Sequence, residues 1–436
     1  MSSRSVQVGI IGLGTVGTGV VKILQSRAKG IAHQLGAPIQ IAGIAVRDPK
    51  KARAIEVPAG ILTDDPMELV RRPEVEIVLE VMGGTEQARQ YVLEALRHKK
   101  HVVTANKALI ALHGQEVFDA AAANGVGVYL EASVAGGIPI IKALHEGLAA
   151  NRIERIYGIL NGTCNYILTQ MSQQGASYQE ALAEAQRLGY AEADPTFDVD
   201  GLDTAHKIAI LSSLAYGAPI SIDQIYVEGI RRIQLEDIRY AETLGYTLKL
   251  LAISELRGSA LSVRVHPALI PSTSVLANVQ GAFNAVAVVG DAVGPTLFYG
   301  QGAGQMPTAS AVVADLLEAA RTVLSGRPAE IPLCWDRRKA VAMPVLPMEE
   351  TETRYYLRMQ VEDRPGVLAE VATILGRYRI SLAAVIQKEP TCAESVPVVM
   401  LTHRAQERNL QAALREIDAL ECTRQPTVCI RLEADV

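Results

Sequence analysis

Two lysines and a run of carboxylates are the side chains whose types and spacing suit acid–base chemistry on a small molecule. Lys107 follows the apolar stretch 101–105, and Lys207 follows Asp203 by four residues. On a helix that spacing places Asp203 and Lys207 on one face, and the apolar run 208–211 predicts that the stem of Lys207 is partly buried. Carboxylates beside such lysines predict a site for a small zwitterion next to a proton carrier.

The carboxylate-rich segment 189–203 has other interpretations. An ion pair between its last carboxylate and Lys207 would only stabilise a helix. A calcium loop is disfavoured because the third ligand before Gly201 and the closing Glu are missing. The zinc pattern H-E-x-x-H also fails, because Ala149 follows His145-Glu146 where a second His is needed.

A glycine-rich loop lies between a predicted strand at 6–11 and a predicted helix at 16–24. The pattern Gly-x-Gly-x-x-Gly in this context is typical of dinucleotide-binding folds. Its glycines permit a tight turn, a close approach of backbone to pyrophosphate, and close packing of helix on strand. The alternative is a glycine-rich turn that binds nothing. The residues predicted to bind the cofactor here are Gly12, Leu13, Gly14, Thr15, Val16 and Gly17.

The end of the second predicted strand, 39–46, indicates which dinucleotide binds. A NAD-specific enzyme usually has Asp or Glu there to bind the ribose hydroxyls. Here Arg47 and Asp48 follow the strand, and Lys51 comes soon after. The guanidinium of Arg47 and the ammoniums of Lys50 and Lys51 suit a 2′-phosphate, so the pattern favours NADP(H), while Asp48 leaves NAD(H) possible. A solvated charged turn is the alternative.

Alternating strands and helices must position these residues. Apolar runs alternate with helical patterns such as 86–98, which is typical of a parallel, doubly wound sheet. Ligands bind outside the carboxyl ends of such strands, so Lys107 is expected to face the cofactor crevice, with a plain surface lysine as the alternative. The predicted strands are 6–11, 39–46, 77–82 and 101–105.

Beyond residue 136 the pattern predicts a mixed α+β domain and then a small C-terminal unit. From residue 355 the order strand, helix, strand, strand, helix, strand indicates a ferredoxin-like sandwich. Prolines between 326 and 350 indicate a linker at which the C-terminal unit could be removed. The predicted divisions are a Rossmann-type domain at 1–134 with helix 308–324 packing back on it, a catalytic and dimerisation domain at 135–307, a linker at 325–352 and the C-terminal unit at 353–436.

The composition is typical of a soluble, cytoplasmic, multidomain protein. The 436 residues are 49% hydrophobic and 20% charged, which argues against disorder. The net charge of −5 argues against nucleic acid as a partner, and no apolar run predicts a membrane span. The cysteines show no C-x-x-C spacing, which indicates a reducing compartment without structural disulfides or a thiolate metal site. They are Cys164, Cys334, Cys392, Cys422 and Cys429.

The segment 185–207, called the signature segment below, resembles the signature of homoserine dehydrogenases at each fixed position. In this chain it reads Ala185-x-x-x-Gly189-Tyr190-Ala191-Glu192-Ala193-Asp194-Pro195-x-x-Asp198-Val199-x-Gly201-x-Asp203-x-x-x-Lys207. The stretches 104–107, 161–166 and 302–304 also resemble that family, although Cys164 stands where the family often has Thr. Asp-Arg-Pro-Gly at 363–366 resembles an ACT regulatory domain, so the chain resembles the monofunctional form with a C-terminal ACT domain.

The resemblance implies an enzyme that interconverts L-homoserine and L-aspartate 4-semialdehyde with NAD(P)(H), in threonine, methionine and isoleucine biosynthesis. It implies that Lys207 donates the proton, with Lys107 close to cofactor and substrate oxygen. Glu192 and Asp203 are expected to bind the α-ammonium of the substrate. Further expected contacts are Tyr190 and Thr163 for the substrate, and Thr104, Lys107, Gly189 and Gly304 for the cofactor.

A carboxylate followed by a glycine-rich turn suits a hard monovalent cation. Glu131 precedes the glycines and proline at 136–139, which can curl backbone carbonyls inward. The resemblance implies sodium held by Glu131 and the carbonyls of Val134, Gly136 and Ile138. An ordinary interdomain turn is the alternative.

Three other functions are open to test. One is another Rossmann dehydrogenase that acts on an amino acid or semialdehyde. A second is an acyl-transferring semialdehyde dehydrogenase, which needs a catalytic cysteine, and Cys164 is the only candidate in the catalytic domain. A third is a ligand sensor, which would be expected to have lost Lys107, Lys207 or Glu192.

The C-terminal unit predicts regulation by an amino acid. Threonine is made from homoserine, so L-threonine is the expected effector at the turn 363–366, where Gly366 lets backbone approach a ligand at a helix N-terminus. Pairing through this unit predicts a homodimer or homotetramer. An ACT unit that only dimerises is the alternative.

Overall fold

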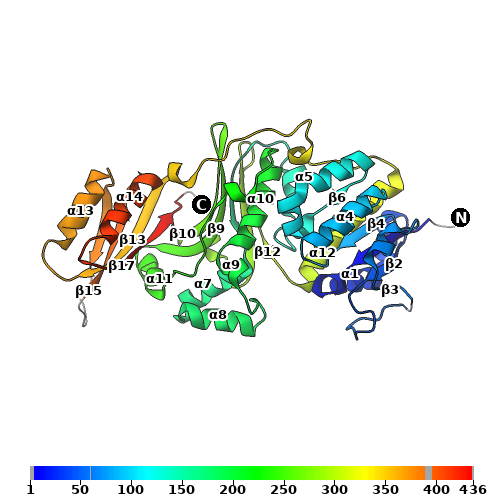
Figure 1. Cartoon of the computed structure of the whole chain (residues 1–436), viewed down its shortest axis with the longest axis horizontal. Coiled ribbons are helices and arrows are strands. Elements are labelled where there is room, and N and C mark those ends of the chain that lie inside the picture. Colours follow the sequence, from blue (N-terminus) through cyan, green and yellow to red (C-terminus); the bar gives the residue numbers. More distant parts are fainter. Residues whose placement is uncertain (1–3, 59, 388–394, 435–436) are drawn as a thin grey trace. The chain divides into compact units, whose positions relative to one another are not determined.

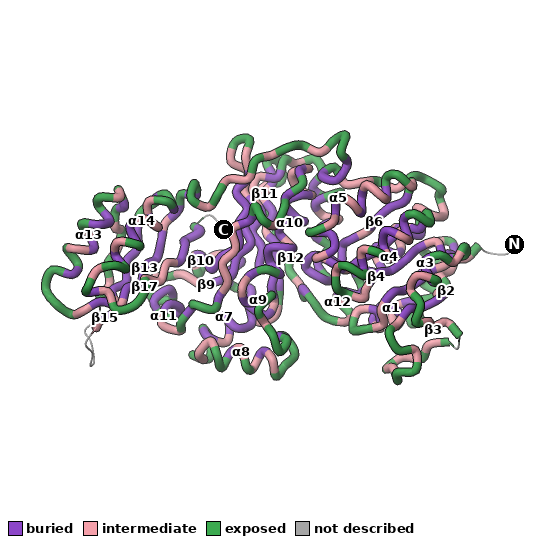
Figure 2. The backbone as a smooth tube through the Cα atoms, in the orientation of Figure 1, coloured by how far each residue is buried: buried purple, intermediate pink, exposed green. Residues whose placement is uncertain are grey.

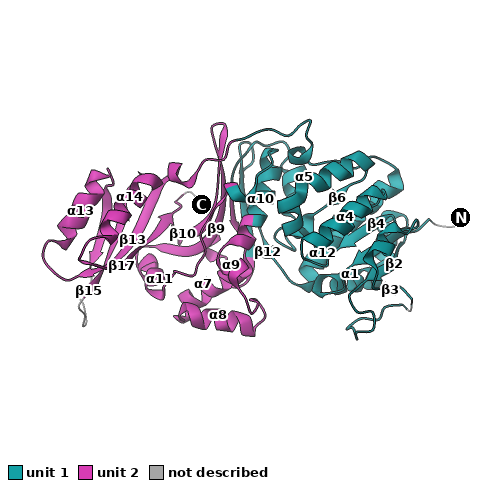
Figure 3. Ribbon diagram, viewed as in Figure 1, with its two compact units in different colours: residues 1–156, 206–223, 284–343 teal, residues 157–205, 224–283, 344–436 magenta. Residues whose placement is uncertain are grey.

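The computed structural model describes residues 4–58, 60–387 and 395–434 (Figure 1). These divide into two compact units, coloured separately in Figure 3. The first unit comprises residues 1–156, 206–223 and 284–343, and the second comprises residues 157–205, 224–283 and 344–436. Cys392, and Lys388 at the end of a predicted strand, lie outside the described residues.

The first unit is built on a six-stranded parallel sheet. Its strand order is β3-β2-β1-β4-β5-β6, and neighbouring strands are parallel throughout its described residues, for example with Val8 opposite Ile41 and Ile77. The central strands are buried along their length, as Figure 2 shows, because helices cover them. The predicted doubly wound α/β class is confirmed. The strands are β1 (Val6–Ile11), β2 (Ile39–Ala45), β3 (Leu62–Thr63), β4 (Ile77–Glu80), β5 (His101–Thr104) and β6 (Val128–Tyr129).

Helix α12 (Gln305–Ser325) packs on this sheet, although it comes nearly two hundred residues after β6. It lies beside α1 (Thr15–Ser26) (Figure 1). A Cβ on Gly19 would lie 2.6 Å from the carbonyl oxygen of Gln305, so the two helices approach too closely for a side chain there. The sheet is also flanked by α2 (Ala28–Leu35), α3 (Pro66–Arg71), α4 (Glu86–Arg97) and α5 (Lys107–Asn124).

Shorter elements complete the first unit. They are η1 (Glu131–Ser133), α6 (Ile140–Lys142), η2 (Ala143–Gly147), η3 (Ile222–Gln224), η5 (Leu333–Trp335) and the neighbouring strands β11 (Phe283–Gly290) and β12 (Gly294–Gln301). Strand β7 (Ile153–Ile159) and helix α10 (Leu202–Tyr216) each contribute residues to both units.

The second unit begins with helices and ends with a mixed sheet. Strand β9 (Tyr246–Arg257) pairs antiparallel with β10 (Ala260–Pro271), and the short strand β8 runs parallel to β10. Helices α7 and α11 contact β9, and α8 packs on α7. The remaining elements of this part are α7 (Gly162–Gln174), α8 (Tyr178–Arg187), α9 (Thr196–Val199), β8 (Tyr226–Val227), α11 (Leu235–Thr243) and η4 (Leu276–Asn278).

After the short turn η6 (Met348–Glu350), residues 352–432 form the predicted β-α-β-β-α-β unit. Its sheet order is β17-β13-β15-β14, all antiparallel, and alternate residues of β13 from Tyr355 to Val361 pack on both helices. The helices therefore cover one face of the sheet. The elements are β13 (Glu352–Glu362), α13 (Val367–Arg377), β14 (Leu382–Gln387), β15 (Ser395–Thr402), β16 (Ala405–Gln406), α14 (Glu407–Asp418) and β17 (Thr423–Leu432).

This C-terminal sheet is joined to the rest of the second unit, which differs from the expectation of a removable domain. Strand β17 pairs in parallel with β10, with Ala268 opposite Arg431. On the opposite face of β13, the buried Arg358 forms an ion pair of 2.6 Å with the buried Asp237 of α11. Cutting the chain at residue 351 would expose the edge of β10 and leave Asp237 without its cation, so a truncation is a poor test of regulation.

None of the described helices is both long enough and apolar enough to cross a membrane. The four cysteines within the described residues are free thiols.

Candidate active site

The glycine loop leaves the N-terminus of α1 open to an anionic ligand. Gly12 has φ +103°, and a Cβ there would lie 2.8 Å from Met82 Cα. A Cβ on Gly17 would lie 2.3 Å from the carbonyl oxygen of Gly12. Gly14 begins the helix without a side-chain cap, and a Cβ on it would meet no atom within 4 Å. The loop with Leu13, Thr15 and Val16 therefore has the uncapped donors and open space that a pyrophosphate needs.

The charged turn after β2 is held by its own side chains. Asp48 Oδ1 accepts a hydrogen bond of 2.9 Å from the Lys50 N–H, and Arg53 donates to the carbonyls of Asp48 and Lys51. The Asp48 carboxylate therefore stabilises the turn through a backbone hydrogen bond. This makes it a poorer partner for the ribose hydroxyls of a dinucleotide. The side chains of Arg47 and Lys51 are exposed, and neither forms a hydrogen bond or an ion pair with another described residue.

A buried carboxylate that the sequence analysis missed orders the ends of β4 and β5. Glu80 is fully buried and accepts hydrogen bonds from the Thr104 hydroxyl at 2.7 Å and the Met82 N–H at 3.0 Å. Burial raises the pKa of Glu80. Thr104 Oγ1 in turn accepts from the Asn106 N–H at 3.0 Å. A carboxylate inside the apolar run 77–82 was the signal that could have revealed this network.

This network positions Lys107, the first residue of α5. Asn106 caps the helix by accepting from the Leu109 N–H at 3.1 Å, and its amide donates to the Gly84 carbonyl at 2.6 Å. Lys107 is half-buried at the carboxyl end of β5. That is the edge of a parallel sheet where ligands bind.

The segment proposed for the cation is a strained turn packed on the glycines before α12. Ala135 and Gly136 both have positive φ, at 54° and 51°. A Cβ on Gly136 would lie 2.4 Å from the carbonyl oxygen of Gly302, so the two backbones nearly touch. Gly304, with φ +122°, then begins α12 without a side-chain cap. The turn and this second open helix N-terminus therefore lie together in the first unit.

The carboxylate of Glu131 has two backbone partners in the first unit. It is buried, and it accepts hydrogen bonds from the backbone N–H groups of Ile141 at 2.9 Å and Lys142 at 2.8 Å. These bonds cap α6. Among the backbone carbonyls expected to hold the cation, that of Ile138 accepts a hydrogen bond from the Ile140 N–H.

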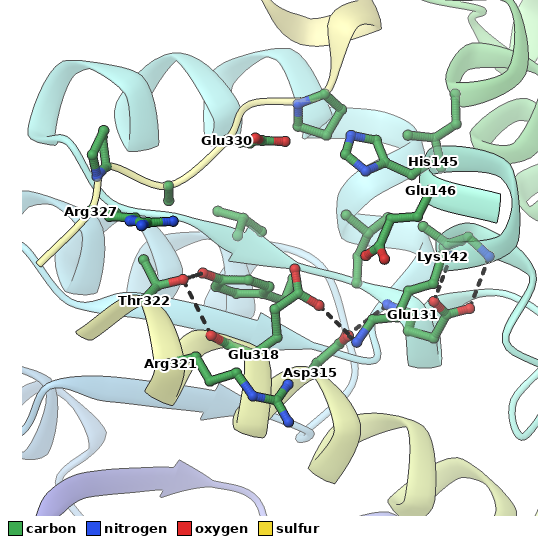
Figure 4. Close-up of a pocket in the computed structure, with 18 of the residues that line it drawn as sticks. Glu131, Lys142, His145, Glu146, Asp315, Glu318, Arg321, Thr322, Arg327 and Glu330 are labelled. Atoms are coloured by element: carbon green, nitrogen blue, oxygen red, sulfur yellow. Dashed lines mark hydrogen bonds and ion pairs between the residues drawn. The ribbon is translucent and has the colours of Figure 1, made fainter. Parts of the chain in front are cut away.

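Glu131 lines a cavity of about 650 Å³ together with a cluster of charged side chains around the buried Asp315 (Figure 4). Lys142 Nζ lies 3.3 Å from Asp315 and 2.7 Å from Glu318. Asp315 also accepts a hydrogen bond of 2.8 Å from the backbone N–H of Glu131. The cluster ties α6 and η1 to α12.

Asp315 is expected to make stability depend on pH. Burial raises its pKa to about 7, although Lys142 lowers it. Between the ordinary value of 3.8 and about 7, the carboxyl ionises in the unfolded chain but stays protonated in the folded one, so stability falls as the pH rises through this window. In Asp315→Asn that loss disappears, and calorimetry should show a smaller fall in Tm from pH 4 to pH 7 than in the parent.

The matched control is Glu146→Gln, an exposed carboxylate on the same cavity. Its curve of Tm against pH should run parallel to that of the parent. Parallel curves for Asp315→Asn as well would contradict the assignment.

In the second unit, two carboxylates of the signature segment, Asp198 and Asp203, both accept hydrogen bonds from the side-chain amide of Asn161. Asn161 begins α7 and donates from Nδ2 to Asp198 at 2.7 Å and to Asp203 at 2.8 Å. Its Oδ1 accepts from the Cys164 N–H at 2.8 Å, which fixes the amide orientation. Thr163 donates to the carbonyl of Tyr190 at 2.6 Å. Thr163, Tyr190 and Asp203 are thus brought together, and Asn161 and Asp198 are site residues that the sequence analysis did not select.

The exposed part of the signature segment carries Gly189 and Glu192. Both are exposed, while Tyr190 packs its ring 4.9 Å from that of Tyr166. Gly189 has φ +77°, which ends the turn after α8. Lys207 lies in α10, half-buried, among residues assigned to the first unit. The lysines therefore belong to the first unit and the predicted substrate carboxylates to the second.

Cys164 is not placed as a nucleophile. Its side chain is fully buried, and the thiol donates to the carbonyl of Asp198 at 3.3 Å. This environment contradicts acyl transfer through Cys164, because a catalytic thiolate needs access to substrate.

Three family models match this chain along most of its length. Residues 12–131 match "Homoserine dehydrogenase, NAD binding domain", residues 139–317 match "Homoserine dehydrogenase", and residues 355–422 match "ACT domain".

Individual relatives agree with these matches. A homoserine dehydrogenase of Pseudomonas aeruginosa is 48% identical over 99% of both chains. The crystal structure of a homoserine dehydrogenase from Thiobacillus denitrificans is 49% identical, covers 99% of both chains and superposes with a TM-score of 0.94. A hyperthermophilic archaeal homoserine dehydrogenase in complex with NADPH is 28% identical and covers 75% of this chain and all of its own, with a TM-score of 0.63.

Proposed function

The chain belongs to the homoserine dehydrogenase family and is an oxidoreductase that acts on a CH–OH group, and from that premise we propose how its own residues work. The proposed reaction interconverts L-homoserine and L-aspartate 4-semialdehyde. The observation that carries the substrate assignment is the carboxylate pair Asp198 and Asp203, held together by Asn161. Two carboxylates in one place suit the α-ammonium of an amino acid.

The dinucleotide binds at the loop 12–17, where the backbone N–H groups at the uncapped N-terminus of α1 donate hydrogen bonds to the pyrophosphate. Thr104, Lys107, Gly189 and Gly304 are proposed as further contacts. When bound, the nicotinamide supplies the hydride that reduces the aldehyde carbon. The chain supplies orientation and protons.

Lys207 is proposed as the proton donor to the substrate oxygen as negative charge develops there. Lys107, at the carboxyl end of β5, stabilises the same oxygen and contacts the cofactor. Glu192 and Asp203 bind the α-ammonium, with Asp198 held beside Asp203 by Asn161, and Tyr190 and Thr163 line the pocket. In the reverse direction Lys207 takes the proton from the alcohol, so the same group serves both.

A monovalent cation, sodium, is proposed at the turn 134–138. The positive φ angles of Ala135 and Gly136 support it, because they turn the flanking carbonyls. With the Glu131 carboxylate committed to two N–H groups, the proposed ligands are the carbonyl oxygens of Glu131, Val134, Gly136 and Ile138. The cation would then brace the turn against Gly302.

Regulation is proposed to come from the ACT domain. An amino acid, with L-threonine as the leading candidate, lowers activity, and paired ACT domains form a homodimer or homotetramer. The proposed divisions remain 1–134, 135–307, 325–352 and 353–436. In this proposal the enzyme works in the cytoplasm, in threonine, methionine and isoleucine biosynthesis.

The test of this function is a spectrophotometric assay of the full chain with L-homoserine, following reduced nicotinamide at neutral to alkaline pH. Turnover with L-homoserine but not with L-serine or L-threonine as substrate supports the proposal. Absence of turnover of L-homoserine with both NAD and NADP would contradict the proposed function.

NADP(H) is proposed as the preferred cofactor, and a double variant at Arg47 and Lys51 tests this preference. Arg47→Ala together with Lys51→Ala should raise KM for NADP by at least about tenfold, because each lost charge-assisted contact is worth about 1.5–3 kcal/mol. KM for NAD should change little, since NAD has no 2′-phosphate. Steady-state kinetics with both cofactors measure this.

The control is Arg27→Ala, an exposed arginine at the end of α1 that does not adjoin the turn. It should leave both KM values unchanged. Equal rises for NAD and NADP in the double variant would contradict a phosphate-binding role.

A further inference from the structure

A buried lysine in the second unit takes no part in the proposed reaction. Lys249 lies in β9, opposite Ala268 of β10, and is 3% exposed. Its Nζ donates hydrogen bonds to Asn165 Oδ1 at 3.1 Å and to the carbonyl of Val279 at 2.5 Å. No carboxylate among the described residues forms an ion pair with it. Because buried charges in proteins are normally paired, this ammonium lacks the partner that its burial calls for.

The protonated side chain of Lys249 needs one more acceptor than the described part of the chain offers it. An ammonium has three N–H donors, and the bonds to Asn165 and Val279 use two of them. Burial lowers the pKa of Lys249 to about 8, so the ammonium is present at neutral pH. An anion beside Nζ would supply both the missing acceptor and the missing charge.

The acceptors of Lys249 are held in place by a second set of hydrogen bonds. Asn165 Nδ2 donates to three carbonyls of the loop 279–283, at 2.9, 3.1 and 3.2 Å. Thr169, one turn further along α7, donates to the carbonyl of Asn165 at 2.7 Å and accepts from the Gly281 N–H at 3.1 Å. Helix α7 and this loop therefore form a fixed wall beside the lysine.

Lys249 lines a cavity of about 250 Å³ that lies within the second unit. One water molecule occupies about 30 Å³ of the liquid, so the cavity has room for a small ion and several waters. Polar side chains that can donate hydrogen bonds to an anion also line it, among them Thr247, Ser272 and Gln280.

Lys249 and Glu242 are the charged residues among those that line this cavity. Glu242 is exposed, so solvent screens its charge, and it accepts a hydrogen bond of 2.5 Å from Ser172. Helices α7 and η4 carry no charged residue. The other charged residues of α11, which do not line the cavity, are Glu236, Asp237 and Arg239.

Two charged or titratable residues of the neighbouring strand β10 face the same side of the sheet as Lys249. They are His266 and Arg264, two and four residues from Ala268. Arg264 forms an ion pair of 2.9 Å with Glu433, and burial lowers the pKa of His266 well below its ordinary value. Neither lines the cavity, so Lys249 is the cation that a ligand in it meets.

We propose that this cavity binds a small monovalent anion, a halide or the carboxylate of a small organic acid, which accepts the third N–H of Lys249. Glu242 disfavours a divalent anion at the same place, because the repulsion grows with the charge of the ligand. The bound anion pairs the ammonium and keeps it protonated, so the bond from Lys249 to Asn165 stays charge-assisted. Asn165 lies one helical turn after Asn161, so the anion braces the start of α7.

The first experiment soaks crystals of the full chain in sodium bromide at pH 7 and locates bromide by its anomalous scattering. A peak should lie within hydrogen-bond distance of Lys249 Nζ. The peak should be absent in Lys249→Met. It should also be absent in Ala277→Leu, which fills the cavity and keeps the lysine. Bromide peaks on the protein surface should persist in all three maps and are the internal control.

The second experiment measures Tm by calorimetry while chloride or acetate replaces a bulky sulfonate at constant sodium concentration. At pH 7 and an anion concentration about ten times Kd, the Tm of the parent should rise by about 2–5 °C more than that of Lys249→Met. The matched control is Lys100→Met, since Lys100 is also buried and its Nζ donates to the carbonyl of Arg72 at 2.8 Å in the first unit. This control should keep the response of the parent.

The same measurement at higher pH tests the pairing with the ammonium. Without the anion, the folded chain releases the Lys249 proton near pH 8, whereas the unfolded chain keeps it up to about pH 10.5. This lysine therefore makes stability rise with pH in that window. The anion binds the protonated form, so its apparent affinity should fall about tenfold for each pH unit above 8. The rise in Tm that chloride causes should accordingly shrink from pH 7 to pH 10.

Bromide peaks on the surface with none in the cavity of the parent would overturn the proposal. A chloride response that Lys249→Met retains would also overturn it, because the anion then binds elsewhere. If Lys249→Met does not fold, the Ala277→Leu crystals and the pH dependence of the parent decide, and a response that stays level from pH 7 to pH 10 contradicts the site. None of these measurements uses homoserine turnover, so their outcome is independent of the proposed function.

Discussion

Lys207→Ala is expected to lower kcat by about 10²–10⁴-fold, the range for loss of general acid–base catalysis. In the proposed mechanism no other side chain delivers a proton to the substrate oxygen, and Lys107 supplies charge rather than the proton. KM for the dinucleotide should stay near that of the parent, because Lys207 lies in α10 and not in the glycine loop. Single-turnover kinetics with reduced cofactor and L-aspartate 4-semialdehyde isolate the step.

The contrasting variant is Glu192→Gln. It removes charge from the proposed ammonium site without touching the proton donor, so it should raise KM for homoserine more than it lowers kcat. Near-normal turnover in Lys207→Ala would remove this lysine from the mechanism. A rise in cofactor KM for Glu192→Gln, with homoserine handling unchanged, would show that the carboxylate serves the dinucleotide instead.

The parallel sheet and its glycine loop were predictable because their signals are local. The apolar run at β1, three glycines and an amphipathic helix follow one another within 21 residues, from Val6 to Ser26. The β-α-β-β-α-β order of the C-terminal domain was predictable for the same reason. Each element there contributes its apolar face to one core, so the residue pattern follows the element period.

The polar residues that order the site were not predictable, because their partners are distant in the sequence. Asn161 bridges Asp198 and Asp203, which lie 37 and 42 residues away. Glu80 bonds Thr104 on the neighbouring strand, 24 residues away in the sequence. A single sequence shows that such residues are polar, but only the folded chain brings a donor to each acceptor.

Charged residues within the strands of the C-terminal domain hide their contacts for a related reason. Arg358 and Arg431 alternate with apolar residues, a pattern that normally indicates a solvent-facing side chain. Both are buried, since α11 covers one face of the C-terminal sheet and Glu407 meets Arg431 on the other. The proline-rich stretch 326–350 looks like a linker, yet the residues after it join the sheet of the second unit.

Arg431→Met is expected to destabilise the second unit by about 3–5 kcal/mol, because it leaves Glu407 buried without a cation. Glu407 is 2% exposed and holds Arg431 through two hydrogen bonds, at 2.6 and 3.0 Å. A loss of this size lowers Tm by on the order of 10 °C in a unit of this size. Differential scanning calorimetry of the full chain measures it.

Arg424→Met is the matched control, since Arg424 lies on the same strand and pairs with Glu362 at an exposed position. It should cost less than about 1 kcal/mol. Adding Glu407→Leu to Arg431→Met should recover part of the lost stability, because the stranded charge is removed along with its partner. Equal losses in the two arginine variants, or no recovery in the double variant, would mean that Arg431 stabilises by packing alone.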